Sequence, residues 1–418
     1  MRFPNGFLWG VSTSAFQVEG SLDADGRGPS IWDGFPSERG ETGAVACDHY
    51  RRWREDVDLI ASLGVNAYRF SIAWPRILPD GRTVEQRGVD HYSRLIDALL
   101  ERGIEPIVTL YHWDLPVSLD WRERDTVDRF AELARVCFDA YGDRVRWWLT
   151  INEPWIVGLL GFLHGLHAPG ISGDVRAEAA VFHHLLLAHG RVAPEAPGTV
   201  GIPLSLYPHY GDEPAARLSD GYVNRWFLDP VLRGSYPDDM RELWEERIGS
   251  LDFVRDGDER EIGSRCDVVG VNYYTRRVIE GREGDGPFPW RVVVPDGVPL
   301  TEAGTEIYPA GLTDLLVRLH EDYGVPTFVT ENGCVYADAP HDEKRVEFLR
   351  DHLAAVHAAI ARGADVRGYC HWSLMDNFEW KLGYAQRFGL VHVDYDTQVR
   401  TVKDSGRAYA RIAKENAL

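Results

Sequence analysis

The chain has 418 residues, of which 44% are hydrophobic and 26% charged, a balance typical of a soluble globular enzyme with a large core. Its formal net charge of −20 argues against a nucleic-acid or membrane partner, because those surfaces are themselves negatively charged. Five cysteines without CxxC spacing, no leader-like segment after Met1 and no long apolar run predict a cytoplasmic protein without disulfides or membrane spans.

One pattern recurs along the chain: a short apolar run, a polar loop and an amphipathic helix. Eight apolar runs are predicted to be strands, at Phe7–Val11, Ala67–Ile72, Glu105–Tyr111, Trp147–Asn152, Val200–Ser205, Val268–Asn272, Thr327–Thr330 and Gly368–Trp372. Helices are predicted near Arg51–Leu63, Val89–Arg102, Thr126–Tyr141, Val175–Arg191, Arg217–Leu232, Gly311–Tyr323, Lys344–Arg362 and Ser405–Asn416. The Gly- and Pro-rich stretch Val278–Gly304 is interpreted as a long loop.

Eight strand–helix units predict an α/β fold, a closed (β/α)₈ TIM barrel that forms a single domain over residues 1–418. The alternative is an open doubly wound sheet. It is disfavoured because no Gly-x-Gly-x-x-Gly turn follows the first predicted strand. In a TIM barrel the reactive groups gather at the C-terminal ends of the strands, so the functional site is expected there.

Two of the predicted strands end in a glutamate beside an asparagine. The fourth strand runs into Asn152-Glu153 and the seventh into Glu331-Asn332, each at a Pro or Gly turn. One such glutamate alone would be interpreted as a solvated loop acid. Two carboxylates on facing strand ends are what retaining glycoside hydrolysis requires, because one attacks the anomeric carbon and the other protonates the leaving oxygen.

The remaining strand ends carry aromatic and polar residues suited to a sugar. Aromatic rings stack on the C–H faces of a sugar, while amides, carboxylates and imidazoles pair with its hydroxyls. Residues of these types follow the first, third, sixth and eighth strands: Gln17, His112, Asn272, Tyr274, Trp372, Glu379 and Trp380. No His-Glu-x-x-His motif or spaced ligand cluster occurs, so neither a metal nor a cofactor is expected.

Ordered motifs along the whole chain point to one family. They include Phe7-Leu8-Trp9-Gly10, Gly28-Pro29-Ser30-Ile31-Trp32-Asp33, Tyr68-Arg69-Phe70-Ser71 and Arg387-Phe388-Gly389-Leu390. With the two glutamate motifs, they make the chain resemble family 1 glycoside hydrolases, the β-glucosidase family. The resemblance implies an exo-acting, retaining β-glycosidase whose partner is a small-molecule β-glycoside. The sequence makes no prediction of oligomeric state.

The resemblance also implies individual roles. Glu153 matches the general acid/base and Glu331 the nucleophile, flanked by Arg69 and Tyr274. The charge on Glu331 is expected to raise the pKa of Glu153, so that Glu153 starts protonated. The residues expected to contact substrate are Gln17, His112, Asn152, Trp155 on the leaving-group side, Asn272, Trp372, Glu379 and Trp380.

The resemblance implies that Glu379 distinguishes members of the family that act on unphosphorylated sugars from those that act on 6-phosphosugars, because a carboxylate at this position would repel a phosphate. The expected substrates are therefore unphosphorylated β-glucosides, together with galactosides or fucosides. The alternatives are a transglycosylase that uses the same intermediate and a non-catalytic sugar-binding barrel.

The chain departs from the family pattern around the leaving-group side. Thr305 stands where relatives usually carry Trp, Val117 where they usually carry Gln, and the loop between Tyr336 and Lys344 looks shortened. Either the leaving-group side is open, or another aromatic residue fills the gap.

Overall fold

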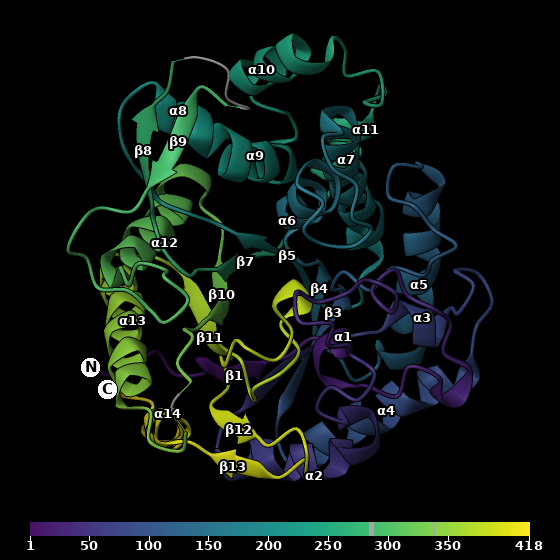
Figure 1. The fold of residues 1–418 in the computed structure, drawn as a ribbon, viewed down its shortest axis with the longest axis vertical. Helices are drawn as coiled ribbons and strands as arrows, with labels where there is room; N and C mark the ends of the chain where they lie inside the picture. The colour runs from purple at the N-terminus through teal and green to yellow at the C-terminus, as the bar shows by residue number, and fades with distance from the viewer. Residues whose placement is uncertain (284–287, 338) are drawn as a thin grey trace.

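The structure is a computed structural model that describes residues 1–283, 288–337 and 339–418. Eight parallel strands lie at its centre: β1 Leu8–Ser12, β2 Ala67–Ser71, β3 Glu105–Tyr111, β4 Trp147–Ile151, β5 Thr199–Ser205, β7 Val268–Asn272, β10 Thr327–Asn332 and β11 Val366–Trp372. They close in the order β1-β11-β10-β7-β5-β4-β3-β2, with helices outside them (Figure 1). The predicted (β/α)₈ barrel is confirmed.

The interior of the barrel is apolar near the strand starts and polar near the strand ends. The apolar layer consists of Ala67, Ile107, Leu149, Val268, Phe328 and Cys370, with Leu8 and Trp147 packed against it. Side chains two residues apart on a strand share a face, so Arg69 follows Ala67 inward and Thr330 follows Phe328. This alternation carries polar groups up to the C-terminal end of the barrel, where the site is expected.

The outer helices follow the predicted amphipathic segments closely. They are α2 His49–Ser62, α4 Gln86–Glu101, α5 Asp125–Tyr141, α7 Val175–Val192, α12 Pro309–Tyr323, α13 Glu343–Ala361 and α14 Asp404–Glu415. The predicted helix Arg217–Leu232 is instead α8 Ala215–Asp220 and α9 Trp226–Arg233, joined by the π-helical turn η4 Gly221–Arg225. The shorter helices are α1 Ala15–Val18, α3 Trp74–Ile77, α6 Pro154–Gly158, α10 Asp238–Ile248 and α11 Asp258–Ile262.

The long loop predicted over Val278–Gly304 is wrong in part. Strands β8 Arg277–Gly281 and β9 Trp290–Val293 form an antiparallel hairpin, and β6 His209–Gly211 pairs with β8 outside the barrel. The hairpin is half exposed, and charged residues and a glycine interrupt its apolar residues, which hides the strand pattern. Residues 284–287 of the predicted loop lie outside the described residues.

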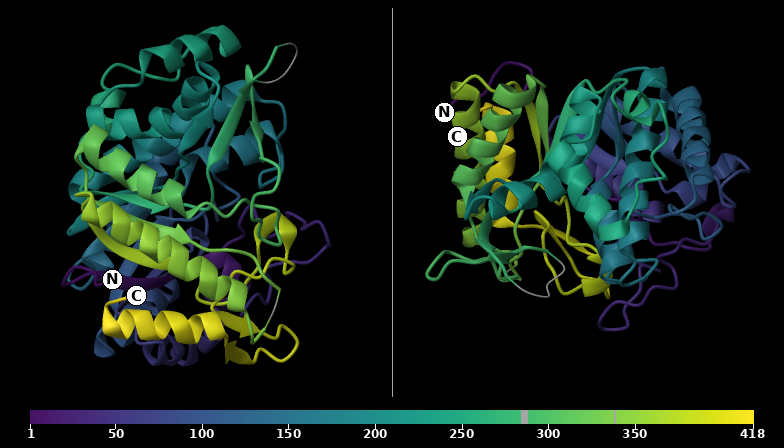
Figure 2. Two further views of the ribbon diagram at one scale, coloured as in Figure 1. Left: turned by 90° about the vertical axis from the view of Figure 1, so that its left-hand side faces the viewer. Right: turned by 90° about the horizontal axis from the view of Figure 1, so that it is seen from above.

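The two chain ends lie side by side (Figure 2). The backbone N–H of Phe3 donates to the carbonyl of Asn416 at 3.0 Å. Two short antiparallel strands, β12 Val391–Val393 and β13 Arg400–Val402, lead from the β11 loop into α14. Within the described ranges, every helix is too short or too polar to cross a bilayer.

Candidate active site

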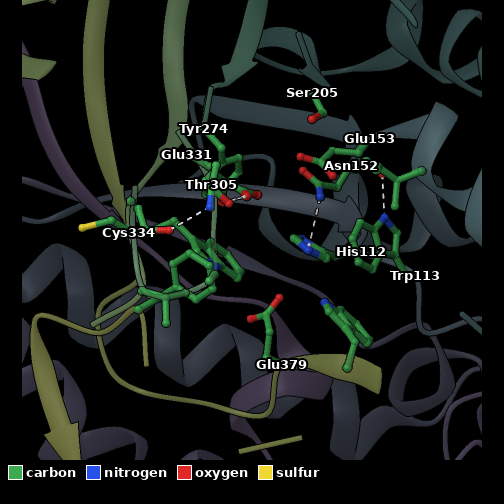
Figure 3. Close-up of a pocket in the computed structure, with 18 of the residues that line it drawn as sticks. His112, Trp113, Asn152, Glu153, Ser205, Tyr274, Thr305, Glu331, Cys334 and Glu379 are labelled. Carbon is green, nitrogen blue, oxygen red and sulfur yellow. Dashed lines mark hydrogen bonds between the residues drawn. The ribbon is translucent and has the colours of Figure 1, made fainter. Parts of the chain in front are cut away.

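A cavity of about 240 Å³ opens at the C-terminal ends of the barrel strands. The predicted site residues that line it are His112, Asn152, Glu153, Tyr274, Glu331, Trp372, Glu379 and Trp380. Glu331 and Glu153 lie on opposite sides of the cavity, and Glu379 reaches it from a third direction (Figure 3). Residues far apart in the chain therefore meet at one place, as the strand ends predicted.

The carboxylate of Glu331 is held at both of its oxygens. Arg69 Nη1 lies 2.5 Å from Oε1, and the Tyr274 hydroxyl donates to Oε2 at 2.7 Å. Arg69 is fully buried inside the barrel, so its guanidinium has little freedom to turn away. The predicted flanking positions of Arg69 and Tyr274 thus correspond to direct hydrogen bonds, which fix the plane of this carboxylate.

Glu153 lies at the turn between β4 and α6, in the left-handed region with φ 49°. A side chain other than glycine is strained there, so the surrounding contacts must hold it. Its N–H donates to the Pro203 carbonyl at 2.9 Å, and the Trp113 indole donates to the preceding Asn152 carbonyl at 2.9 Å. Asn272 Nδ2 donates to Glu153 Oε1 at 2.7 Å.

Burial, followed by the nearby charge of Glu331, raises the pKa of Glu153 to about 8. Glu153 is therefore mostly protonated at neutral pH, as a general acid must be before the first step. The hydrogen bond from Asn272 and the charge of Arg69 act in the opposite direction on this pKa, but they are the smaller influences.

Asn152 links the two sides of the cavity. Its Oδ1 accepts from Arg69 Nη2 at 2.6 Å and from Asn272 Nδ2 at 3.1 Å, which identifies the other end of the amide as Nδ2. That Nδ2 lies 3.2 Å from His112 Nε2, so Nε2 accepts and the imidazole proton sits on Nδ1. Burial holds the pKa of His112 well below its usual value, so the ring is neutral.

Glu379 is oriented by Gln17, which lies behind the cavity wall. Gln17 Nε2 lies 3.2 Å from Glu379 Oε2 and 3.0 Å from Asn377 Oδ1, while the Ser14 hydroxyl donates to Gln17 Oε1 at 2.6 Å. Burial and the charge of Glu331 raise the pKa of Glu379 to about 8. The free site therefore holds two acids that are mostly neutral at pH 7, Glu153 and Glu379.

Aromatic rings form one wall of the cavity. The Trp372 ring stacks on His112 with centroids 5.7 Å apart, and Trp380 lies 4.8 Å from Trp113. Sequence reasoning missed Trp113 as a lining residue, although its place directly after His112 was a usable signal. It also missed Ser205 and Tyr207, which line the cavity near Glu153 and have no distinctive motif around them.

The leaving-group predictions have mixed outcomes. Thr305 lines the cavity beside Thr301 and Ala303, so the position that departs from the family pattern does face the site. Val117 is 55% exposed and lies outside the lining. Trp155 is buried outside the lining, with its indole donating to the Ser205 carbonyl at 2.9 Å, and its contact with a leaving group stays a prediction.

Comparisons with known proteins agree on one family. The model of glycosyl hydrolase family 1 matches residues 1–418. The chain is 43% identical to β-glucosidase A of Thermotoga maritima, covering 100% of this chain and 99% of the relative. It is 42% identical to a bifunctional β-D-glucosidase/β-D-fucosidase of Bifidobacterium breve at the same two coverages.

Solved structures give the same result. The β-glucosidase of Exiguobacterium antarcticum B7 matches with a TM-score of 0.94 at 40% identity, covering 99% of this chain and 98% of that one. The Thermotoga maritima β-glucosidase in complex with noeuromycin matches with a TM-score of 0.93 at 43% identity, covering 100% and 99%.

Proposed function

This chain belongs to glycosyl hydrolase family 1 and is a glycoside hydrolase, and from that premise we propose that it is a retaining, exo-acting β-glycosidase. The observation that carries the proposal is the pair of carboxyl groups across the cavity. Glu331 is fixed by Arg69 and Tyr274, while the raised pKa of Glu153 keeps that residue protonated. A nucleophile and a general acid are the two groups that double displacement requires.

In the first half-reaction Glu331 attacks the anomeric carbon and forms a bond to it. The glycosidic C–O bond breaks, and the leaving oxygen takes the proton from Glu153. The product is a covalent glycosyl-enzyme intermediate. The two donors on Glu331 hold its carboxylate in one plane, which limits the reorganisation needed for attack.

In the second half-reaction Glu153 acts as a base. Esterification removes the negative charge of Glu331, which was one of the influences that raised the pKa of Glu153. Glu153 then takes a proton from water as the water oxygen attacks the anomeric carbon and releases Glu331. One residue thereby serves as acid first and base afterwards.

The proposed substrates are unphosphorylated β-glucosides, with fucosides or galactosides as further substrates. A phosphate beside Glu379 would enter a buried region that already holds Glu331, so a second negative group there is unfavourable. The Bifidobacterium breve relative, named for both glucosidase and fucosidase activity, supports the inclusion of fucosides.

Proton NMR of the first-formed sugar tests the mechanism. Hydrolysis of a β-glucoside should release β-glucose first, with the α anomer appearing only at the rate of mutarotation. An initial α-glucose signal would overturn the assignment of Glu331 as nucleophile. Chromogenic glucoside, galactoside, fucoside and 6-phosphoglucoside, assayed side by side, test the substrate class, and preferential cleavage of the 6-phosphoglucoside would refute it.

A further inference from the structure

Asn272 holds Glu153, the proposed acid/base, by a hydrogen bond, so the orientation of the Asn272 amide matters. Asn272 is fully buried in the barrel, and its Nδ2 carries both of its polar contacts on the Glu153 side, to Glu153 Oε1 and Asn152 Oδ1. The two ends of a carboxamide have nearly the same shape, so packing alone does not decide which end faces Glu153. A hydrogen-bond partner on the other end must contribute to that choice.

That partner is Thr330, the residue before Glu331. Its hydroxyl lies 2.6 Å from Asn272 Oδ1 and donates to it, and both side chains are fully buried. The Thr330 carbonyl accepts from the Ser12 hydroxyl at 2.8 Å, which holds the backbone that carries this hydroxyl. Among the residues the structure describes, Thr330 supplies the one side-chain donor to Asn272 Oδ1.

We propose that Thr330 is a positioning residue for the acid/base: its hydroxyl fixes the Asn272 amide, which in turn holds Glu153. The Asn272 N–H occupies Glu153 Oε1, so the acid proton resides on Oε2, the oxygen left free to protonate the leaving group. The residue next to the nucleophile thereby sets the direction in which the acid delivers its proton. This proposal rests on the glycosidase function proposed above.

Besides Asn272, several charged or titratable groups surround Glu153, so a prediction of how the pH profile changes has to take each of them into account. They come from five different strand ends and loops: Arg69, Tyr207, Tyr274, Glu331 and Glu379. None of these groups hydrogen-bonds to the Thr330 hydroxyl, whose partner is Asn272. A change in the pH profile of that variant therefore reports on the Asn272 hydrogen bond, which lowers the pKa of Glu153 when present.

The test is the substitution Thr330→Val, which removes the hydroxyl and keeps the shape. Phenyl β-glucoside needs protonation of its leaving oxygen, whereas 2,4-dinitrophenyl β-glucoside needs little. We expect kcat/KM for the phenyl glucoside to fall about 10-fold to 100-fold, as for a misplaced catalytic group, and the dinitrophenyl value to fall less than about threefold. Because the lost hydrogen bond raises the pKa of Glu153, the alkaline limb of the phenyl-glucoside profile should move to higher pH.

Two controls separate positioning from general damage. Thr330→Ser keeps the hydroxyl and should restore both the rate and the pH limb. Thr150→Val removes another fully buried barrel hydroxyl, which pairs with His189 Nδ1 at 2.9 Å, and should not discriminate between the two substrates. Equal losses on both substrates, or an unchanged phenyl-glucoside rate and pH limb in Thr330→Val, would overturn the proposal.

A second measurement covers the case in which Thr330→Val folds poorly. Asn272→Ala removes the side chain that links Thr330 to Glu153. In the Asn272→Ala background, kcat/KM for phenyl glucoside should differ by less than twofold between Thr330→Ser and Thr330→Ala. In the wild-type background the same two variants should differ by about tenfold or more. Equal ratios in both backgrounds would refute the link through Asn272. A wild-type protein inactive on every glucoside would instead refute the proposed function.

Discussion

At the scale of single residues, the two glutamates of the cavity have opposite surroundings. Glu331 receives hydrogen bonds from a guanidinium and a phenol, whereas Glu153 receives one from an amide. Burial and the charge of Glu331 raise the pKa of Glu153 to about 8. Two carboxyl groups of the same type are thus prepared for different tasks by what lies next to them.

Alanine substitutions of these two residues should fail in different ways. Glu331→Ala should lose at least about 10³-fold in kcat, and azide should restore turnover with α-glucosyl azide as the product, because only one displacement occurs. Glu153→Ala should still react with 2,4-dinitrophenyl β-glucoside and should give β-glucosyl azide after two displacements. NMR of the azide products distinguishes the outcomes, and the same anomer from both variants would contradict the roles.

At the scale of elements, the segment before α12 presents Thr305 to the cavity on a rigid support. The Thr301 N–H donates to the Thr305 carbonyl at 2.9 Å, and the Thr305 N–H donates to the Thr301 hydroxyl at 3.2 Å. The next residue, Glu306, pairs with Arg276 at 2.8 Å, and the Arg276 guanidinium stacks 3.8 Å from the Tyr308 ring. A side chain at position 305 is therefore held in place by its neighbours.

Thr305→Trp should add a stacking surface for a sugar leaving group. An aromatic platform contributes roughly 0.5–1.5 kcal/mol. The ratio of kcat/KM for cellobiose to that for a bulky apolar aryl glucoside should rise by up to about tenfold, or ~1.4 kcal/mol. Val117→Trp is the matched control, since that exposed position lies outside the lining and should leave the ratio unchanged. An unmoved ratio in Thr305→Trp would remove position 305 from leaving-group recognition.

At the scale of the whole molecule, a buried ion pair ties the C-terminal helix to the loop that carries Glu379. Lys403 immediately precedes α14, and its Nζ lies 2.8 Å from Asp376 Oδ1, with both side chains fully buried. Asp376 also receives the Gly389 N–H at 2.9 Å and lies 3.2 Å from Arg387. Burial acts to raise the pKa of Asp376, but the nearby imidazole of His392 and the ammonium group of Lys403 hold it below its usual value.

Lys403→Met should destabilise the protein by about 3 kcal/mol, because it leaves a buried carboxylate short of one counter-charge. The exposed pair of Arg407 and Asp404 on the same helix provides the control, and Arg407→Ala should cost less than about 1 kcal/mol. Unfolding free energies from chemical denaturation give both values. If the two variants lost the same unfolding free energy, burial would not strengthen the contribution of the Lys403–Asp376 ion pair to stability.

The sequence by itself determined the barrel and the identity of its two glutamates. Apolar runs of strand length recur eight times with helices between them, and a closed parallel barrel is the arrangement that buries both faces of such strands. Glu153 and Glu331 could be predicted because each lies at the C-terminal end of a strand, and these strand ends meet at one end of a barrel. Each strand, and each glutamate at its end, is marked by the residues next to it in the chain, so these features can be recognised without the tertiary structure.

Only the tertiary structure decided which side chains pair with one another. Arg69 meets Glu331 across 262 positions of chain, and Asn272 reaches Glu153 across 119. Closure of the barrel also brings the Thr330 hydroxyl to Asn272, and it buries Glu153, which raises the pKa of that residue. The β8–β9 hairpin escaped prediction for a different reason: it is half exposed, so its own sequence shows no clear apolar strand pattern, and it lies outside the barrel beside β6.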